Sequence, residues 1–371
     1  MLAGVVLAHK HKDKKVTFIG SNQDIEQLNK GGMYSDEPLF TGYYESARNI
    51  DTTTSYDILN TADIIIVSSD CINNDGTFNY FNIDKHLDNI RKKAKAGAIV
   101  IFYTIFDIGR TNILVNQYLR KDLHVAHIPP FIVEGEAIKS LIDPHTLVIG
   151  YHNKTDIMMT KIRALYYYVN YDDIIETDCT TSELSKLASN FMLAQRISTI
   201  NSFEYLANEK HANILDIIKV LKKDSRIGSD YMSPSAGFGG GNFNKVINCI
   251  SRSCMDTTFN TYFGNAGRAN HYHMVKIAQK IGHNKRVLFL GYGYKEHTSS
   301  TERSPTSIII QELANDVEYN IYDIHHSEYN KKPEGDYDYV ILMLNEKEYI
   351  DIAKQYPENK IIDPKYLMTK I

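Results

Sequence analysis

TSELSKLASNFMLAQRISTINSFEYLA occupies residues 181–207, and SDYMSPSAGFGGGNFNK occupies residues 229–245. Apolar residues in the first segment recur every three or four positions, which predicts a long helix with one core-facing stripe. Thr180 and Glu183 have the spacing of a capping box, so we expect the helix to begin there. The second segment is rich in Gly, Ser and Pro, which predicts a loop that serves as a linker or lets its backbone approach a ligand closely.

On both sides of this stretch, short apolar runs alternate with segments of helical spacing, which predicts α/β architecture with parallel sheets. The expected strands are 15–20, 62–68, 98–104, 125–128, 147–150, 286–291, 318–322, 339–344 and 360–363. The expected helices outside the central region are 24–29, 83–96, 112–120, 306–314 and 347–354. We therefore divide the chain into three parts: an α/β domain at 1–178, a helical region with the loop at 179–280, and a second α/β domain at 281–371.

Composition excludes several classes of protein. The chain has 371 residues and a net charge of −4 without a long basic run, which argues against nucleic-acid binding. Its 4 cysteines show no metal-type spacing, so we expect a reducing compartment and no metal site. No apolar run reaches the roughly 18 residues of a membrane span, and no signal peptide is evident. We expect a cytoplasmic protein; the bias towards Asn, Ile and Lys is typical of AT-rich genomes, and for a viral chain the virion is the alternative location.

The long helix and the loop resemble the UDP-glucose/GDP-mannose dehydrogenase family, whose loop reads GFGGxCFxKD. Members oxidise the 6-hydroxyl of a nucleotide sugar to a carboxylate with NAD. The resemblance implies two Rossmann-like domains joined by a long central helix over nearly the whole chain, and a homodimer formed through that helix. It does not fix the sugar, because enzymes for UDP-glucose, UDP-N-acetyl sugars and GDP-mannose share these motifs.

The catalytic positions implied by the resemblance are only partly kept. Asn242 stands where the family has its nucleophilic cysteine, and Val246 replaces the loop aspartate. In the family the cysteine thiolate traps the aldehyde intermediate and carries the resulting thioester until water hydrolyses it. An amide forms neither adduct. In PPFIVEGEA (129–137), Pro130 replaces the first family glutamate and Glu134 matches the second.

Three further positions match residues that contact substrate or water in the family. Lys186 and Asn190 lie one helical turn apart on the long helix, and the alternative is a solvated lysine beside an ordinary polar residue. Thr104 ends the strand AIVIFYT and resembles a threonine that orders water, although a threonine at a strand end is also common without such a role.

The cofactor site implied by the resemblance is altered. Residues 1–10 resemble the helix that follows the family's GxGxxG turn, so the first strand and the glycines would lie upstream of Met1. Gly20 occupies the position of the acid that bonds the adenosine ribose, and 69–71 replace a cofactor-contacting segment. Either the gene start is incomplete, or the N-terminal sheet lacks its first strand and has closed the gap by re-pairing. NAD is the family's cofactor; here we expect its binding to be lost.

The positions that contact the substrate in the family match this chain better than the cofactor positions do. The matching positions for a nucleotide sugar are Arg226, Gly237, Phe238, Gly239, Gly240, Lys245 and Lys295. Arg226 matches an arginine that reaches the sugar of the neighbouring subunit. In the tail, Ser299 and Ser300 stand where the family has two aspartates, and Arg303 lies one residue later than the family's arginine. Both differences weaken the match to a uridine-binding segment.

Three functions follow from these matches. The first is a pseudoenzyme, a degenerate member of the family with a structural or regulatory role. The second is an active NAD-dependent oxidoreductase with a truncated start, limited to oxidation of the alcohol to the aldehyde. The third is a module that binds a nucleotide sugar without turning it over.

Overall fold

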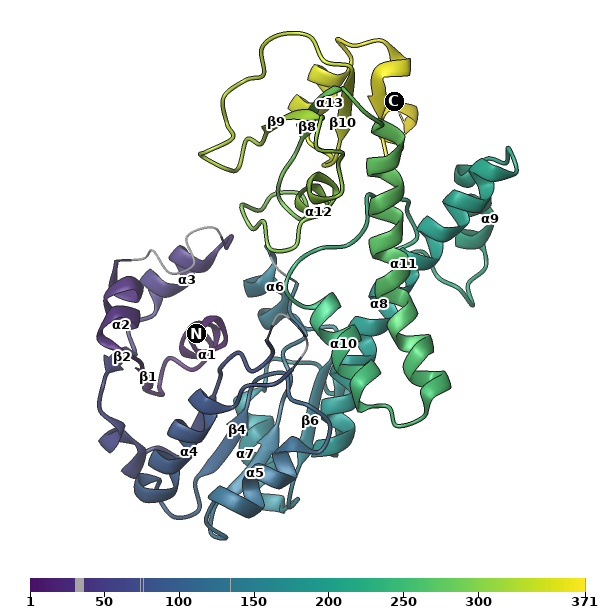
Figure 1. Cartoon of the computed structure of the whole chain (residues 1–371). Coiled ribbons are helices and arrows are strands. Elements are labelled where there is room, and N and C mark those ends of the chain that lie inside the picture. The colour runs from purple at the N-terminus through teal and green to yellow at the C-terminus, as the bar shows by residue number, and fades with distance from the viewer. Residues whose placement is uncertain (31–36, 74, 76, 134, 371) are drawn as a thin grey trace. The chain divides into compact units, whose positions relative to one another are not determined.

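The computed structural model describes residues 1–30, 37–73, 75, 77–133 and 135–370 (Figure 1). The chain forms two compact units, one made of residues 1–73 and 78–188 and the other of residues 74–77 and 189–371. The long central helix predicted from the sequence is α8 (Cys179–Glu209), which contributes to both units. The three-part division expected from the sequence remains a prediction.

The first unit contains a five-stranded sheet in the order β3-β4-β5-β6-β7. The strand bounds are Ile64–Val67, Ile99–Phe102, His124–His127, Leu147–Tyr151 and Ile174–Asp178. Neighbouring strands are parallel except β5 and β6, which are antiparallel. The strands expected at 62–68, 98–104, 125–128 and 147–150 are confirmed, whereas the antiparallel pair departs from the expected all-parallel sheet.

Helices cover both faces of this sheet, because successive side chains of a strand point to opposite faces. Val100 and Phe102 of β4 pack in a core with α4 (Phe81–Lys93) and α5 (Arg110–Tyr118). Ile99 and Ile101 pack on the other face. The helices of that second core are α1 (Leu2–Lys10) and α7 (Asp156–Leu165), and the unit also contains α6 (Ala137–Ile142), η1 (Tyr56–Asn60) and η2 (Tyr171–Asp173).

Two further strands of the first unit form a sheet of their own. β1 (Val16–Ile19) and β2 (Ile50–Thr53) are parallel, with α2 (Asn22–Asn29) and α3 (Phe40–Ser46) between them in the chain. Within the described residues no ladder joins this pair to β3, and Figure 1 shows the pair apart from the strands β4 and β6. The N-terminal sheet is thus interrupted where the sequence predicts a missing strand. Among the described residues, the re-pairing considered from the sequence is not seen between β1 and β3.

Helix α1 bridges the two sheets of the first unit. Its Val5 and Val6 belong to a core that includes Phe18 and Ile50 of the small sheet. Its Leu7 belongs to the core of the large sheet. One helix therefore holds together two sheets that share no backbone hydrogen bonds in the described residues.

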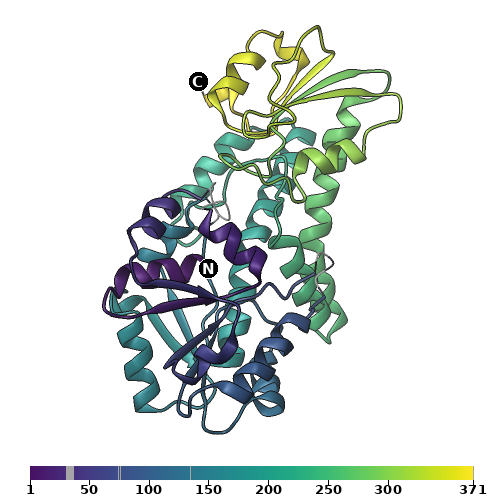
Figure 2. The ribbon, with the colours of Figure 1, turned by 90° about the vertical axis from the view of Figure 1, so that its left-hand side faces the viewer.

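The second unit contains a four-stranded parallel sheet in the order β11-β10-β8-β9, which Figure 2 shows side by side in green to yellow. The strand bounds are Ile361–Ile362, Tyr339–Leu342, Arg286–Leu290 and Glu318–Tyr322. The helices of this unit besides α8 are α9 (Ile214–Lys223), α10 (Phe243–Ser253), α11 (Thr257–Ile281), α12 (Pro305–Gln311), α13 (Lys347–Ala353), η3 (Glu358–Lys360) and η4 (Met368–Lys370). The end of α11 packs with β8 and β10 in one continuous core.

The start of α8 differs from the sequence prediction. Asp178 caps the helix, since its carboxylate accepts from the Thr181 backbone N–H at 3.0 Å and from the Thr181 hydroxyl at 2.6 Å. Glu183 instead accepts from the Gly109 and Thr111 backbone N–H groups at 2.5 and 2.7 Å. The predicted capping box of Thr180 and Glu183 is therefore wrong. Glu183 caps α5, whose first turn has N–H groups without partners inside the helix.

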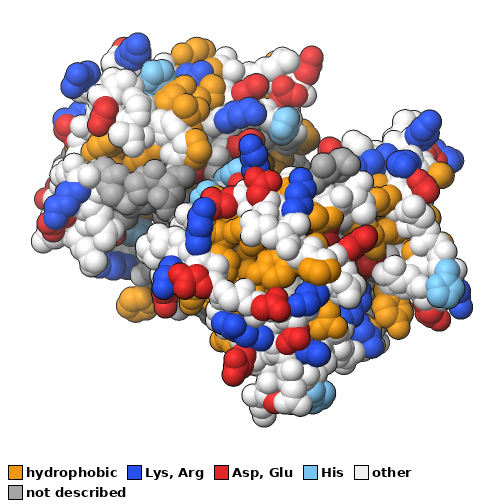
Figure 3. Space-filling view, turned by 90° about the horizontal axis from the view of Figure 1, so that it is seen from above, with side chains coloured by type: hydrophobic (Ala, Val, Ile, Leu, Met, Phe, Trp, Pro, Cys, Tyr) orange, Lys and Arg blue, Asp and Glu red, His pale blue; other side chains and the backbone are white. Residues whose placement is uncertain are grey.

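No helix among the described residues is long and apolar enough to cross a membrane. On the face shown in Figure 3, acidic and basic side chains are interspersed. That pattern agrees with the small net charge of −4 and lacks the large basic field that binds phosphate backbones.

Candidate functional site

The glycine-rich loop lies in the second unit and is held by α11. The Phe238 backbone N–H donates to Oδ1 of Asn270 at 2.9 Å, and Nδ2 of Asn270 donates to the Phe238 carbonyl at 3.0 Å. Gly237 has φ of +118°, which an L side chain rarely adopts. Asn270 is buried, so this pair of hydrogen bonds fixes the first half of the loop in one conformation.

The second half of the loop lies against residues 294–303 of the tail. A Cβ on Gly239 would stand 2.4 Å from the carbonyl oxygen of Arg303, and one on Gly240 would stand 3.0 Å from the Tyr294 ring. The Gly240 N–H donates to the Glu302 carbonyl at 2.8 Å. The glycines are therefore required by a close approach of two chain segments, and this approach joins the loop to the segment that carries Lys295.

Asn242 directly follows the glycines and is the N-cap residue of α10. Its side chain makes no capping hydrogen bond to the first turn of that helix. Lys245 is buried in the same turn, with its Nζ 3.4 Å from Oε1 of Glu302. Val246, at the position predicted for a lost aspartate, is fully buried and packs as an ordinary core residue. The polar groups at this helix start are thus an amide and an ammonium, without a thiol.

Lys186 and Asn190 both lie on α8 and both are 7% exposed. The ammonium of Lys186 lies 4.6 Å from the centre of the Phe131 ring. Burial lowers the pKa of Lys186 to about 8, because the charged form loses its hydration. The solvated lysine considered as the alternative is therefore wrong for Lys186.

Thr104 is buried at the end of β4, and its hydroxyl donates to the Ser69 carbonyl at 2.5 Å. The Thr104 carbonyl lies 3.0 Å from Nε2 of His127, whose Nδ1 lies 3.0 Å from the Ser182 hydroxyl. Burial lowers the pKa of His127 to about 4, so the imidazole is neutral at ordinary pH. No sequence motif points to His127 or Ser182, which tie the strand ends to the start of α8.

Three predicted site residues remain: Arg226, Lys295 and Glu134. Arg226 is exposed after α9, and its guanidinium pairs with Asp224 at 2.9 and 2.6 Å. The ammonium of Lys295 lies 5.9 Å from the centre of the Tyr294 ring. Glu134 lies outside the described residues. The structure thus brings together the glycine loop, Lys245 and the Lys295 segment, and places Lys186 and Thr104 in the other unit.

The end of β1 does not supply an acid for a ribose. Gly20 is followed by Ser21, which caps α2 with Asp24. The Asp24 carboxylate accepts from the Ser21 backbone N–H at 2.9 Å and from the Ser21 hydroxyl at 2.6 Å. The first acid after Gly20 in the sequence is therefore engaged in a helix cap.

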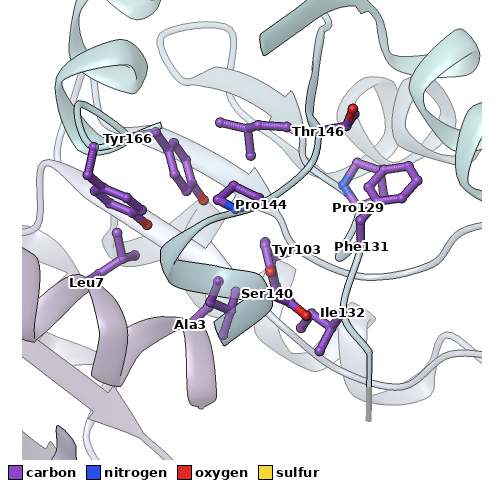
Figure 4. Close-up of a pocket in the computed structure, with 13 residues that line it drawn as sticks. Ala3, Leu7, Tyr103, Pro129, Phe131, Ile132, Ser140, Pro144, Thr146 and Tyr166 are labelled. Atoms are coloured by element: carbon purple, nitrogen blue, oxygen red, sulfur yellow. The ribbon is translucent and has the colours of Figure 1, made fainter. Parts of the chain in front are cut away.

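A small cavity lies beneath α1 in the first unit (Figure 4). Its volume is about 30 Å³, enough for about two water molecules and far too small for a nucleotide. Ala3 and Leu7 of α1 line one side, and Tyr103 and Tyr166 also border it. The buried hydroxyl of Tyr166 has no hydrogen-bond partner among the described residues, so a water in this cavity would satisfy it.

Comparisons with known proteins agree with this geometry. Residues 1–170 match the model of the UDP-glucose/GDP-mannose dehydrogenase family, NAD binding domain, and residues 180–272 match the model of its central domain. The chain is 27% identical to a UDP-glucose 6-dehydrogenase of Drosophila melanogaster over 86% of this chain and 73% of that one. It is 31% identical to UDP-glucose 6-dehydrogenase 2 of Oryza sativa subsp. japonica over 53% of this chain, a match that spans only 43% of the rice enzyme.

Solved structures show the same fold. A UDP-glucose dehydrogenase from the archaeon Pyrobaculum islandicum superposes with a TM-score of 0.85 at 19% identity, over 98% of this chain and 92% of that chain. A UDP-D-ManNAc dehydrogenase from Pyrococcus horikoshii superposes with a TM-score of 0.82 at 19% identity, over 99% of this chain and 93% of that chain.

Proposed function

Because the chain belongs to the UDP-glucose/GDP-mannose dehydrogenase family, we propose that it is a pseudoenzyme of that family, with a structural or regulatory role in place of oxidation. The observation that carries the proposal is Asn242 at the start of α10, immediately after the glycine loop. Oxidation of an alcohol to an acid removes two hydrides from one carbon. In the family the cysteine adds to the aldehyde to give a thiohemiacetal, and removal of the second hydride converts this adduct to a thioester. An amide nitrogen is not nucleophilic, so Asn242 cannot hold the aldehyde. Loss of a covalent nucleophile lowers kcat by up to about a million-fold in other enzymes.

We also propose that this chain has lost NAD binding. A dinucleotide needs a glycine-rich turn between a strand and a helix, with the pyrophosphate at the helix N-terminus. Gly20 stands where the family resemblance places the acid for the ribose, and Asp24, the first acid after it, is engaged in the α2 cap. We therefore route no step through this cofactor, and we propose that its binding is lost together with the nucleophile.

A second function, binding of a nucleotide sugar without turnover, is favoured by the contact between the glycine loop and the tail. The Gly240–Glu302 hydrogen bond holds the loop against the segment that carries Lys295. Asn270 holds the other half of the loop. In this proposal the preformed loop approaches the sugar, and Lys295 contacts the phosphates as a point charge.

We further propose that the chain forms a homodimer through α8. Met192, Phe203 and Leu206 share one face of this helix and are 54%, 43% and 46% exposed. Large apolar side chains that repeat along one exposed helix face are typical of protein interfaces. Light scattering on the full chain is expected to give twice the chain mass. Met192→Glu is expected to shift the protein towards monomer, whereas Val220→Glu, at an exposed apolar residue of α9, leaves the mass unchanged. A monomeric wild type would exclude the dimer.

Calorimetric titration tests the two functions separately. The account predicts no heat of binding with NAD. Heat with UDP-glucose alone, reduced at least tenfold in affinity by Lys295→Ala, supports the binding module. If neither ligand gives a heat of binding, the result supports the pseudoenzyme with a structural or regulatory role. Tight NAD binding would contradict the proposed loss of the cofactor site.

A further inference from the structure

Two histidines and a glutamate that are not among the site residues expected from the sequence meet in the tail of the second unit. Nδ1 of His297 and Nε2 of His325 each lie 3.1 Å from Oε1 of Glu346. All three ligand atoms lie within 4.8 Å of one another. We propose that His297, His325 and Glu346 form a binding site for a divalent transition-metal ion, and that zinc is the preferred ion.

The three residues come from three consecutive strand ends of the four-stranded parallel sheet. His297 follows β8, His325 follows β9 and Glu346 follows β10. In the order β11-β10-β8-β9, β8 lies between β10 and β9. The chain passes from β8 to β9 on one side of it, and then to β10 on its other side. In open α/β sheets, ligands bind at the carboxyl ends of strands where the strand order reverses in this way.

Two buried or partly buried acids hold the three loops in place. Asp323 is 1% exposed; its Oδ2 accepts from the Tyr292 N–H at 2.6 Å and its Oδ1 from the His325 N–H at 2.8 Å. Glu296 accepts from the Asn345 N–H at 3.2 Å and is also paired with Lys365. Asp323 thus joins the loops after β8 and β9, and Glu296 joins the loops after β8 and β10. The ligand residues are preorganised by their neighbours, as in built metal sites.

The ligand chemistry favours zinc over magnesium or calcium. Two imidazoles and one carboxylate are the protein ligands of many catalytic zinc sites, whereas Mg²⁺ and Ca²⁺ prefer oxygen ligands alone. Zinc bonds of about 2.0–2.2 Å place tetrahedral ligand atoms about 3.3 Å apart, close to the two distances of 3.1 Å seen here. The His297 side chain is 77% exposed and that of Glu346 is 12% exposed. The carboxylate would therefore anchor the ion from inside, and the solvent side stays open for a water or an anionic ligand.

Calorimetry with zinc sulfate on the full chain, after removal of metal by a chelator, tests the proposal. One ion per chain is expected, and zinc is expected to raise the melting temperature. His297→Ala removes an exposed side chain without disturbing the core, and should weaken zinc binding at least tenfold. Glu346→Gln should weaken it more.

His283→Ala is the matched control, because His283 is an equally exposed histidine that pairs with Asp316 at 3.2 Å elsewhere in the unit. It should bind zinc as the wild type does. Equal zinc affinity in the wild type and His297→Ala, or equal loss in His283→Ala, overturns the site, as does a wild type that binds no zinc.

Discussion

The two α/β regions of the molecule differ in the continuity of their sheets. In the second unit β8 has hydrogen-bonded neighbours on both sides, and its residues 287–290 are completely buried. In the first unit β1 has one neighbour in the described chain, and every residue of β1 is only partly buried. A strand in the centre of a parallel sheet is normally covered on both faces and both edges. In the first unit, α1 packs against both the β1–β2 pair and the five-stranded sheet.

The same difference bears on chemistry. The continuous sheet gathers three braced loops at its carboxyl edge, and these loops carry the proposed metal ligands. In the first unit, the end of β1 is followed by Gly20 and by the α2 cap of Ser21 and Asp24.

The largest expected effect compares a phenylalanine from each sheet. Phe289→Ala, in the fully buried centre of β8, should lower the free energy of unfolding by about 3–5 kcal/mol. Phe18→Ala, in partly buried β1, should lower it by only about 1–2 kcal/mol, because the substitution removes less buried apolar surface. Hydrogen exchange of the amides in each sheet measures both values. Equal losses would show that the interrupted sheet is packed as tightly as the continuous one.

The two units also differ in the surroundings of a buried lysine. Lys245 in the second unit has Glu302 as an ion partner, whereas Lys186 in the first lies over an aromatic ring. With a folded pKa of about 8 and an unfolded value of about 10.4, Lys186 binds fewer protons in the folded state between these pH values. The free energy of unfolding should therefore rise by roughly 2–3 kcal/mol across that window.

Lys186→Met should abolish this rise, as followed by urea denaturation between pH 8 and pH 10.4. Lys219→Met, at an exposed lysine of α9, should retain it. A rise that persists in Lys186→Met would mean that another group is its source.

The smallest effect compares two glycines. Gly239→Ala brings a methyl group against the Arg303 carbonyl and should cost about 1–3 kcal/mol, with weaker binding of UDP-glucose if the loop holds a sugar. Gly42→Ala, in α3 with no atom within 4 Å of the new methyl, should stabilise the first unit by roughly 0.5–1 kcal/mol. Thermal unfolding checks both. A neutral Gly239→Ala would contradict the close approach of loop and tail.

Much of this fold is readable from the sequence because its strands are apolar runs of ordinary length. The run KVTFIG predicts β1 and RVLFLG predicts β8, both close to their observed bounds. β2 (IDTT) escapes prediction, since it has no apolar alternation and forms only through its pairing with β1. β7 was also not expected, because its run at Ile174–Ile175 is short and ends in charged and polar residues.

The site was predictable only where its residues are close in sequence. The glycine loop and Lys245 form one motif, and the structure keeps them together. Glu183 was assigned to the wrong helix cap because its partners, Gly109 and Thr111, lie far back in the chain. The His297, His325 and Glu346 cluster comes from three separate loops, so no spacing rule could reveal it.

Turnover tests the central claim most directly. Wild type and Asn242→Cys are incubated with UDP-glucose and NAD, and both NADH and the sugar acid are quantified. The account predicts neither product from the wild type, because Asn242 supplies no thiol, and, with the proposed loss of NAD binding, none from Asn242→Cys. Formation of NADH together with the uronic acid by the wild type would contradict it.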